Sequence, residues 1–175
     1  MIRHEQREVG VIAEWQAVES EWSDHRWRVV DLLPGAAQAP PWTLLASSPG
    51  VRRYFAGNAE LHLYPLETDT LKHNLEGPQP AVYVFLRATE AAPGMSLLGA
   101  TVCAGEAQAH VDTGSDLVEA VPMPPDLAVW IGDFVARNHV ERPGWKRKRD
   151  RDDRGDARSG DRGAGRREEM DADDE

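Results

Sequence analysis

The sequence predicts an α+β fold, a mainly antiparallel sheet of about seven short strands that curls into a barrel or sandwich and is closed by a C-terminal helix. Residues 80–87, Pro-Ala-Val-Tyr-Val-Phe-Leu-Arg, are apolar on both faces for a full strand length, which is typical of a central buried strand. Further along, Leu127, Trp130, Ile131 and Phe134 have the i, i+3, i+4, i+7 spacing of an amphipathic helix. That helix is expected from Pro124 to His139, because prolines fit a first turn.

Short alternating apolar runs predict the first strands. Residues 9–15 alternate well enough for a strand, with Val9, Val11 and Ala13 on one face. A connector rich in aromatic and charged residues, 21–28, is expected to lead into a second strand at 29–33. A third short strand is expected at 42–46.

Residues 51–66 predict a β-hairpin. Gly57-Asn58 separates two strand-like runs, and a glycine at the first central position suits a type II′ turn. Beyond it, Leu61 and Leu63 alternate with other residues at the period of two that a strand requires.

The remaining elements follow in order along the chain. We expect a helical crossover at 67–75, strands at 97–103 and 117–121, and an alanine-rich helix at 104–112.

The chain is divided into a single globular domain, 1–142, and a charged tail, 143–175. From Trp145 onward the sequence consists largely of Arg, Asp, Gly and Glu, with almost no apolar residue. Such a segment buries too little surface to offset the entropy of ordering it. We therefore predict that the tail is disordered.

Charge and composition exclude several classes of partner for the domain. The net charge is −10, and residues 1–140 carry 9 Lys and Arg against 18 Asp and Glu. An acidic surface repels phosphate backbones and anionic lipid, so neither nucleic acid nor a membrane is expected as a partner. The N-terminus lacks the apolar stretch of a signal peptide, and the single cysteine suits a reducing compartment. A cytoplasmic location is expected.

No cofactor or metal site is predicted. None of the 6 histidines has the spacing of a ligand pair, and no phosphate-binding glycine loop or nucleophile elbow follows a strand. Cys103 could be a nucleophile if His110 drew off its proton. Its apolar surroundings favour the alternative, a cysteine that packs as a small hydrophobic residue.

The most unusual polar stretch is 22–28. Two tryptophans flank a charged triplet there, and aromatic residues with arginine are typical of protein–protein interfaces. The alternative is a pair of tryptophans that anchors a loop on the core, with the charges in solvent. The candidate partner-binding residues are Trp22, Asp24, His25, Arg26 and Trp27.

Blocks of residues in this chain resemble those of a small bacterial family, a domain of unknown function whose genes lie beside those of molybdenum-dependent formate dehydrogenases and their maturation factors. The resemblance covers most of residues 8–142. It is carried by Trp22-Ser23-Asp24-His25-Arg26-Trp27 with Leu33-Pro34-Gly35, by the strand at 80–87, by Ala100-Thr101-Val102 with Glu106-Ala107, and by Val121-Pro122-Met123-Pro124-Pro125 with Trp130 and Phe134.

The resemblance implies an accessory role rather than a reaction, because the family has no catalytic motif to transfer to these residues. We expect a non-catalytic binding or assembly protein whose partner is a formate dehydrogenase subunit or maturation factor. The alternative is a small cytoplasmic enzyme with Cys103 or the Asp24/His25 pair in a pocket.

Overall fold

The computed structural model describes residues 3–141, so the tail predicted at 143–175 lies outside the described residues. The strands are β1 Glu5–Ala17, β2 His25–Pro34, β3 Thr43–Ser48, β4 Val51–Leu63, β5 Ala81–Ala88, β6 Met95–Thr101 and β7 Asp116–Pro122. The helices are α1 Thr68–Glu76, α2 Ala104–Asp112 and α3 Pro125–Asn138, with a 3₁₀ turn at Pro65–Glu67 before α1.

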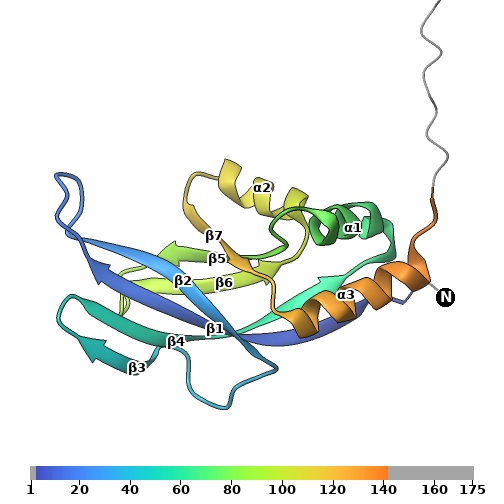
Figure 1. Cartoon of the computed structure of the whole chain (residues 1–175). Helices are drawn as coiled ribbons and strands as arrows, with labels where there is room; N and C mark the ends of the chain where they lie inside the picture. Colours follow the sequence, from blue (N-terminus) through green and yellow to red (C-terminus); the bar gives the residue numbers. More distant parts are fainter. Residues whose placement is uncertain (1–2, 142–175) are drawn as a thin grey trace, which may run out of the picture. The chain divides into compact units, whose positions relative to one another are not determined.

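Two antiparallel sheets lie one above the other (Figure 1). Their strand orders are β2-β1-β4-β3 and β6-β5-β7, and each pair of neighbours is antiparallel. The α+β class and the C-terminal helix are confirmed, but the sheets do not close into a barrel. Within residues 3–141 no strand of one sheet pairs with a strand of the other, and the chain passes from the first sheet to the second through α1.

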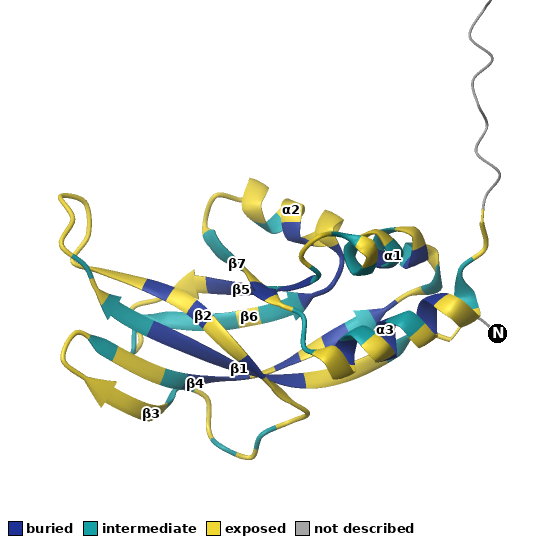
Figure 2. Cartoon of the chain, in the orientation of Figure 1, coloured by how far each residue is buried: buried dark blue, intermediate teal, exposed yellow. Residues whose placement is uncertain are grey.

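The core lies between the two sheets and under α3. Val82, Val84 and Leu86 on β5 and Val11 on β1 are fully buried. Figure 2 shows buried stretches in the middle of β1 and β5 and exposed residues along β3. The prediction of 80–87 as a central strand is confirmed, because β5 is the middle strand of its sheet.

Helix α3 covers one end of this core. Its first residue is Pro125, which lacks the N–H that would be unpaired at this position. Leu127, Trp130, Ile131 and Phe134 are all buried, as the helical spacing predicted. The other helix predictions also hold, with α1 and α2 close to their expected bounds.

The hairpin predicted at Gly57-Asn58 is wrong, because β4 runs through both residues. Gly57 has a φ of 140°. It pairs with Val11, whereas Phe55 pairs with the next residue, Ile12, so one residue of β4 is extra at this point. This is a β-bulge, another feature for which glycine is favoured. The turn that joins β3 to β4 lies instead at Pro49-Gly50.

Candidate functional site

The β1–β2 hairpin ends in a loop that stands clear of the other elements (Figure 1). Residues 18–24 connect the strands, and Val18 N–H donates to the carbonyl of Asp24 at 2.9 Å to close the loop. Glu19, Glu21 and Asp24 give this loop three carboxylates and no cation. The loop is therefore an acidic, solvent-exposed tip.

Four of the five candidate partner-binding residues are exposed on or beside this tip. Trp22 is 92% exposed. Asp24 Oδ1 lies 2.6 Å from His25 Nδ1, and this hydrogen bond, with a bond from the backbone, holds the pKa of Asp24 below its usual value. Arg26 Nε donates to Gln16 Oε1 at 2.8 Å across the hairpin. The structure thus brings these side chains together on one exposed segment.

Trp27 lies apart from the other four, in the core. It is 6% exposed and packs against Trp42 and Tyr54, with ring centroids 5.6 Å away in each case. The prediction of 25–28 as part of a connector is wrong, because β2 starts at His25. In this strand alternate side chains point inward, so Trp27 and Val29 are buried whereas Arg26 and Arg28 are exposed.

The two groups considered for an enzyme site, Cys103 and the Asp24/His25 pair, lie in different surroundings. Cys103 is 8% exposed, and no histidine is paired with its thiol in the part of the chain described. The Asp24/His25 pair forms, but on the exposed tip. Within residues 3–141 no group of three or more His, Cys, Asp or Glu side chains is placed to hold a metal ion.

A second cluster of polar residues connects α2 to β5 and β7. His110 Nδ1 lies 2.7 Å from Asp116 Oδ2, and Arg87 Nε and Nη2 each lie 2.7 Å from Asp116 Oδ1. The Asp116 side chain is inaccessible to solvent. The hydrogen bonds from Arg87 and then His110 lower the pKa of Asp116, and the same carboxylate raises the pKa of Arg87.

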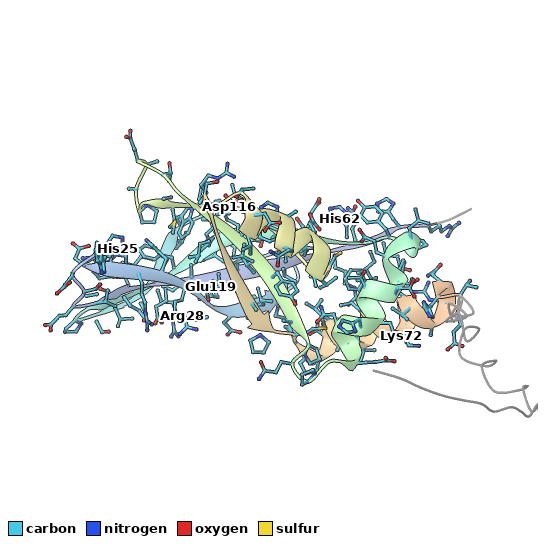
Figure 3. The ribbon with its side chains drawn as sticks, turned by 90° about the horizontal axis from the view of Figure 1, so that it is seen from above. His25, Arg28, His62, Lys72, Asp116 and Glu119 are labelled. Atoms are coloured by element: carbon cyan, nitrogen blue, oxygen red, sulfur yellow. The ribbon has the colours of Figure 1, made fainter. Side chains whose placement is uncertain are left out.

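A cavity of about 360 Å³ lies beside this cluster, between β4, β6 and the helix α2. Its polar lining includes Glu60 and His62 from β4, and Glu106 and His110 from α2. In Figure 3, α2 lies between the labelled Asp116 and His62. Sequence analysis missed this site, because only the Glu106/His110 spacing of one helical turn hints at it.

A protein-family model matches residues 8–149, and its description reads "Protein of unknown function (DUF3305)". The chain belongs to the DUF3305 family. The matched part of this DUF3305 chain includes every helix and strand above apart from the first residues of β1. The comparisons with curated proteins and with solved structures gave no match.

Two of the sequence blocks that carry the family resemblance lie at the two sites of the DUF3305 chain. The block at 22–27 forms the exposed tip and the first residues of β2. The block at Glu106-Ala107 lies in α2 beside the cavity. Among the described residues, no helix is long and apolar enough to cross a membrane.

Proposed function

We propose that this DUF3305 protein is a non-catalytic binding and assembly protein for a molybdenum-dependent formate dehydrogenase. Its partner in this proposal is a subunit of that enzyme or one of its maturation factors. The choice of partner follows from the neighbouring genes of the family that the sequence resembles. The exposed tip, residues 18–24, is the binding surface in this proposal, together with His25 and Arg26 at the start of β2.

The observation that carries the proposal is the exposure of Trp22. A tryptophan that is 92% exposed leaves a large apolar surface in water. Tryptophan and arginine are enriched among the residues that dominate protein–protein binding energies. Trp22 sits on a loop with Arg26 two residues beyond its end, and neither side chain is needed to fill the core.

The charges around Trp22 indicate the kind of surface that receives it. Glu19, Glu21 and Asp24 make the tip acidic, so a complementary partner surface is basic around an apolar pocket. Attraction between such surfaces speeds association at low ionic strength and is screened by salt. We therefore expect binding that weakens as salt concentration rises.

Alanine substitutions at the tip test this function in cells that make the dehydrogenase. We expect Trp22→Ala, and separately the triple substitution of Asp24, His25 and Arg26 by alanine, to reduce both formate dehydrogenase activity and the amount of its subunits or maturation factors that copurifies with the tagged protein. A hot-spot loss of about 2 kcal/mol corresponds to a dissociation constant raised roughly thirtyfold.

A matched control replaces three exposed polar residues away from the tip, His73, Glu90 and Gln108, by alanine. This control should leave activity, copurification and the melting curve unchanged. Full dehydrogenase activity with normal levels of a tip variant would eliminate the tip as the functional surface. Loss of activity together with a collapsed melting curve would show that the tip supports folding instead.

A further inference from the structure

The cavity beside α2 presents hydrogen-bond acceptors from its polar side chains. Glu60 and Glu106 contribute carboxylates, and His62 and His110 contribute imidazole rings. The one amide in the lining, Asn58, is already engaged, because it accepts from Ala37 N–H at 3.0 Å and donates to Ala37 carbonyl at 2.9 Å. A ligand that satisfies these side chains must therefore bring N–H or O–H donors.

Each imidazole has one nitrogen near a carboxylate and one nitrogen without a hydrogen-bond partner among the described residues. His110 Nδ1 faces Asp116 at 2.7 Å, and His62 Nε2 lies 3.4 Å from Glu60 Oε2. In a neutral ring, the nitrogen that faces the carboxylate carries the proton and the other nitrogen is an acceptor. Within residues 3–141, His110 Nε2 has no hydrogen-bond partner, and His62 Nδ1 is shielded from solvent and also has none.

The His110 ring is held in a fixed orientation, so its acceptor atom, Nε2, keeps a fixed position in the wall of the cavity. One face stacks on Phe85, with ring centroids 3.7 Å apart and an angle of 12° between the planes. Arg87 in turn holds Asp116, so this carboxylate fixes both the tautomer and the orientation of the His110 ring. Because Nδ1 points to Asp116, the opposite edge of the ring is available to a ligand.

The negative charge beside the cavity is not compensated by lysine or arginine. Glu60 pairs directly with Glu8 across the β1–β4 ladder, an unfavourable arrangement for two like charges. On the other side Glu67 is close to Glu106, and partial burial followed by the charge of Glu106 raises the pKa of Glu67. No ion pair with a lysine or arginine is formed by Glu60, Glu67 or Glu106 in the described region. A cation in the cavity would reduce both repulsions.

We propose that this cavity is a binding site for an organic cation with N–H donors, an alkylammonium or alkylguanidinium group. The carboxylates of Glu60 and Glu106 attract the charge, and Nε2 of His110 accepts one N–H. Leu97 and Leu98, which also line the cavity, contact the alkyl part. The volume of about 360 Å³ lies within the usual range of small-ligand sites. This site is separate from the tip proposed for partner binding.

Titration followed by amide NMR tests the site with defined probes. We use n-butylguanidinium and n-butylammonium, with n-butylurea as the uncharged control of the same shape as the first. The two cations should shift amide signals of residues 58–62, 97–100 and 106–110 in a saturable way. The urea should cause no saturable shift. Absence of saturation by both cations at 50 mM, or equal binding of the urea, would overturn the proposal.

Variants link the binding to the named side chains. Glu60→Gln with Glu106→Gln should raise the dissociation constant about tenfold or more, as expected for the loss of two close charges. His110→Asn keeps an N–H near Asp116 but removes Nε2, and should weaken binding several-fold. Glu90→Gln with Asp133→Asn makes the same change in net charge at residues that do not line the cavity, and should leave binding unchanged.

The outcomes distinguish a specific binding site in the cavity from weak, nonspecific attraction of cations to an acidic protein. Equal weakening in the cavity variant and in the control would show that only net charge matters, and would overturn the proposal. If Glu60→Gln with Glu106→Gln does not fold, the single substitutions and His110→Asn give the same test. A blocked tripeptide with a central arginine then identifies the source: competition with n-butylguanidinium points to a side chain of a partner, and its absence points to a free small molecule.

Discussion

The indole Nε1 of Trp130 on α3 donates a hydrogen bond to Glu5 Oε2 on β1 at 2.9 Å. Arg137 Nη2 lies 2.9 Å from the other oxygen of the same carboxylate, and the Arg7 guanidinium lies 4.9 Å from the centre of the Trp130 ring. The carboxylate of Glu5 thus joins the first strand to the last helix, across 125 positions in the sequence.

Glu5→Ala should destabilise the domain, because it leaves the N–H of the buried Trp130 side chain without its acceptor. The expected loss is about 1 to 3 kcal/mol in the free energy of unfolding, the usual penalty for an unpaired buried polar group. Urea denaturation measures it. Gln6→Ala, an exposed residue on the same strand, is the control and should change stability by about 0.5 kcal/mol or less. Equal effects of the two substitutions would show that the hydrogen bond contributes nothing specific.

Phe134→Ala tests the buried face of α3. Phe134 is fully buried, so its removal should lower the free energy of unfolding by about 3 to 5 kcal/mol. Trp130→Ala is expected in the same range. Val129 lies on the same helix and is 64% exposed, and Val129→Ala should be almost neutral. A shift in denaturation midpoint for Phe134→Ala no larger than that for Val129→Ala would contradict the assignment of this face to the core.

Elements whose signal is local could be predicted from the sequence. Residues 80–87 form a strand because six consecutive apolar residues need burial on both faces, and α3 forms because its apolar residues recur at helical spacing. The number of strands follows from such runs except in β4, which the predicted hairpin divided into two strands. The division of the strands between two sheets does not follow from the sequence, because it depends on pairings between distant strands such as β1 with β4.

Gly57 shows why a local signal can mislead. A glycine between two strand-like runs suits a turn and a bulge equally well, since both need a conformation with positive φ. The difference lies in the partner strand: β1 is 13 residues long and pairs with β4 on both sides of Gly57. Only this long-range pairing keeps β4 extended through the glycine.

The candidate sites differ in how far they could be predicted. The tip residues lie within one short segment, so their aromatic and charged composition is evident from the sequence. The burial of Trp27 is not evident, because it depends on the alternation of side chains along β2, and the charged residues on either side of Trp27 favour a loop. The cavity takes its polar residues from β4 and α2, which are more than 40 positions apart in the chain. These residues match no known sequence motif of a binding site, so only the folded structure shows that they line one cavity.

The bulge at Gly57 predicts opposite effects for the same substitution at two glycines. Gly57 has a φ of 140°, so Gly57→Ala should cost about 1 to 3 kcal/mol of strain. Gly132 lies inside α3, and a methyl group added there meets no atom within 4 Å. Gly132→Ala should therefore stabilise by about 0.5 to 1 kcal/mol. Thermal melting of both variants checks this, and stabilisation by Gly57→Ala would contradict the strained conformation.

Because the ionised Asp116 carboxylate favours folding, the domain is expected to lose stability in acid. The pKa of Asp116 is lowered in the folded protein, chiefly by Arg87 and then by His110, so the ionised form favours folding. This contribution is fully present above the usual aspartate pKa of about 3.9 and is lost as the pH falls through the lower folded value. The Asp116→Asn variant should be less stable than the wild type at pH 7, and the difference should shrink below about pH 4.

Melting curves recorded from pH 7 to pH 2.5 measure this difference. Asp112→Asn, an exposed aspartate in the same region, is the control and should follow the wild-type curve. A stability difference between Asp116→Asn and wild type that stays constant over this range would contradict a stabilising role of the ionised Asp116 carboxylate.

Trp22 and Trp27 should respond differently to replacement by alanine, although they are five positions apart in the same segment. Trp27 is 6% exposed, so Trp27→Ala should cost about 3 to 5 kcal/mol of folding free energy. Trp22 is 92% exposed, so Trp22→Ala should change stability by about 0.5 kcal/mol or less. Under the proposed function it should nevertheless reduce copurification of the dehydrogenase subunits or maturation factors. Stability losses of similar size in both variants would mean that Trp22 packs on the domain in solution, and the tip would then lose its role as a free binding surface.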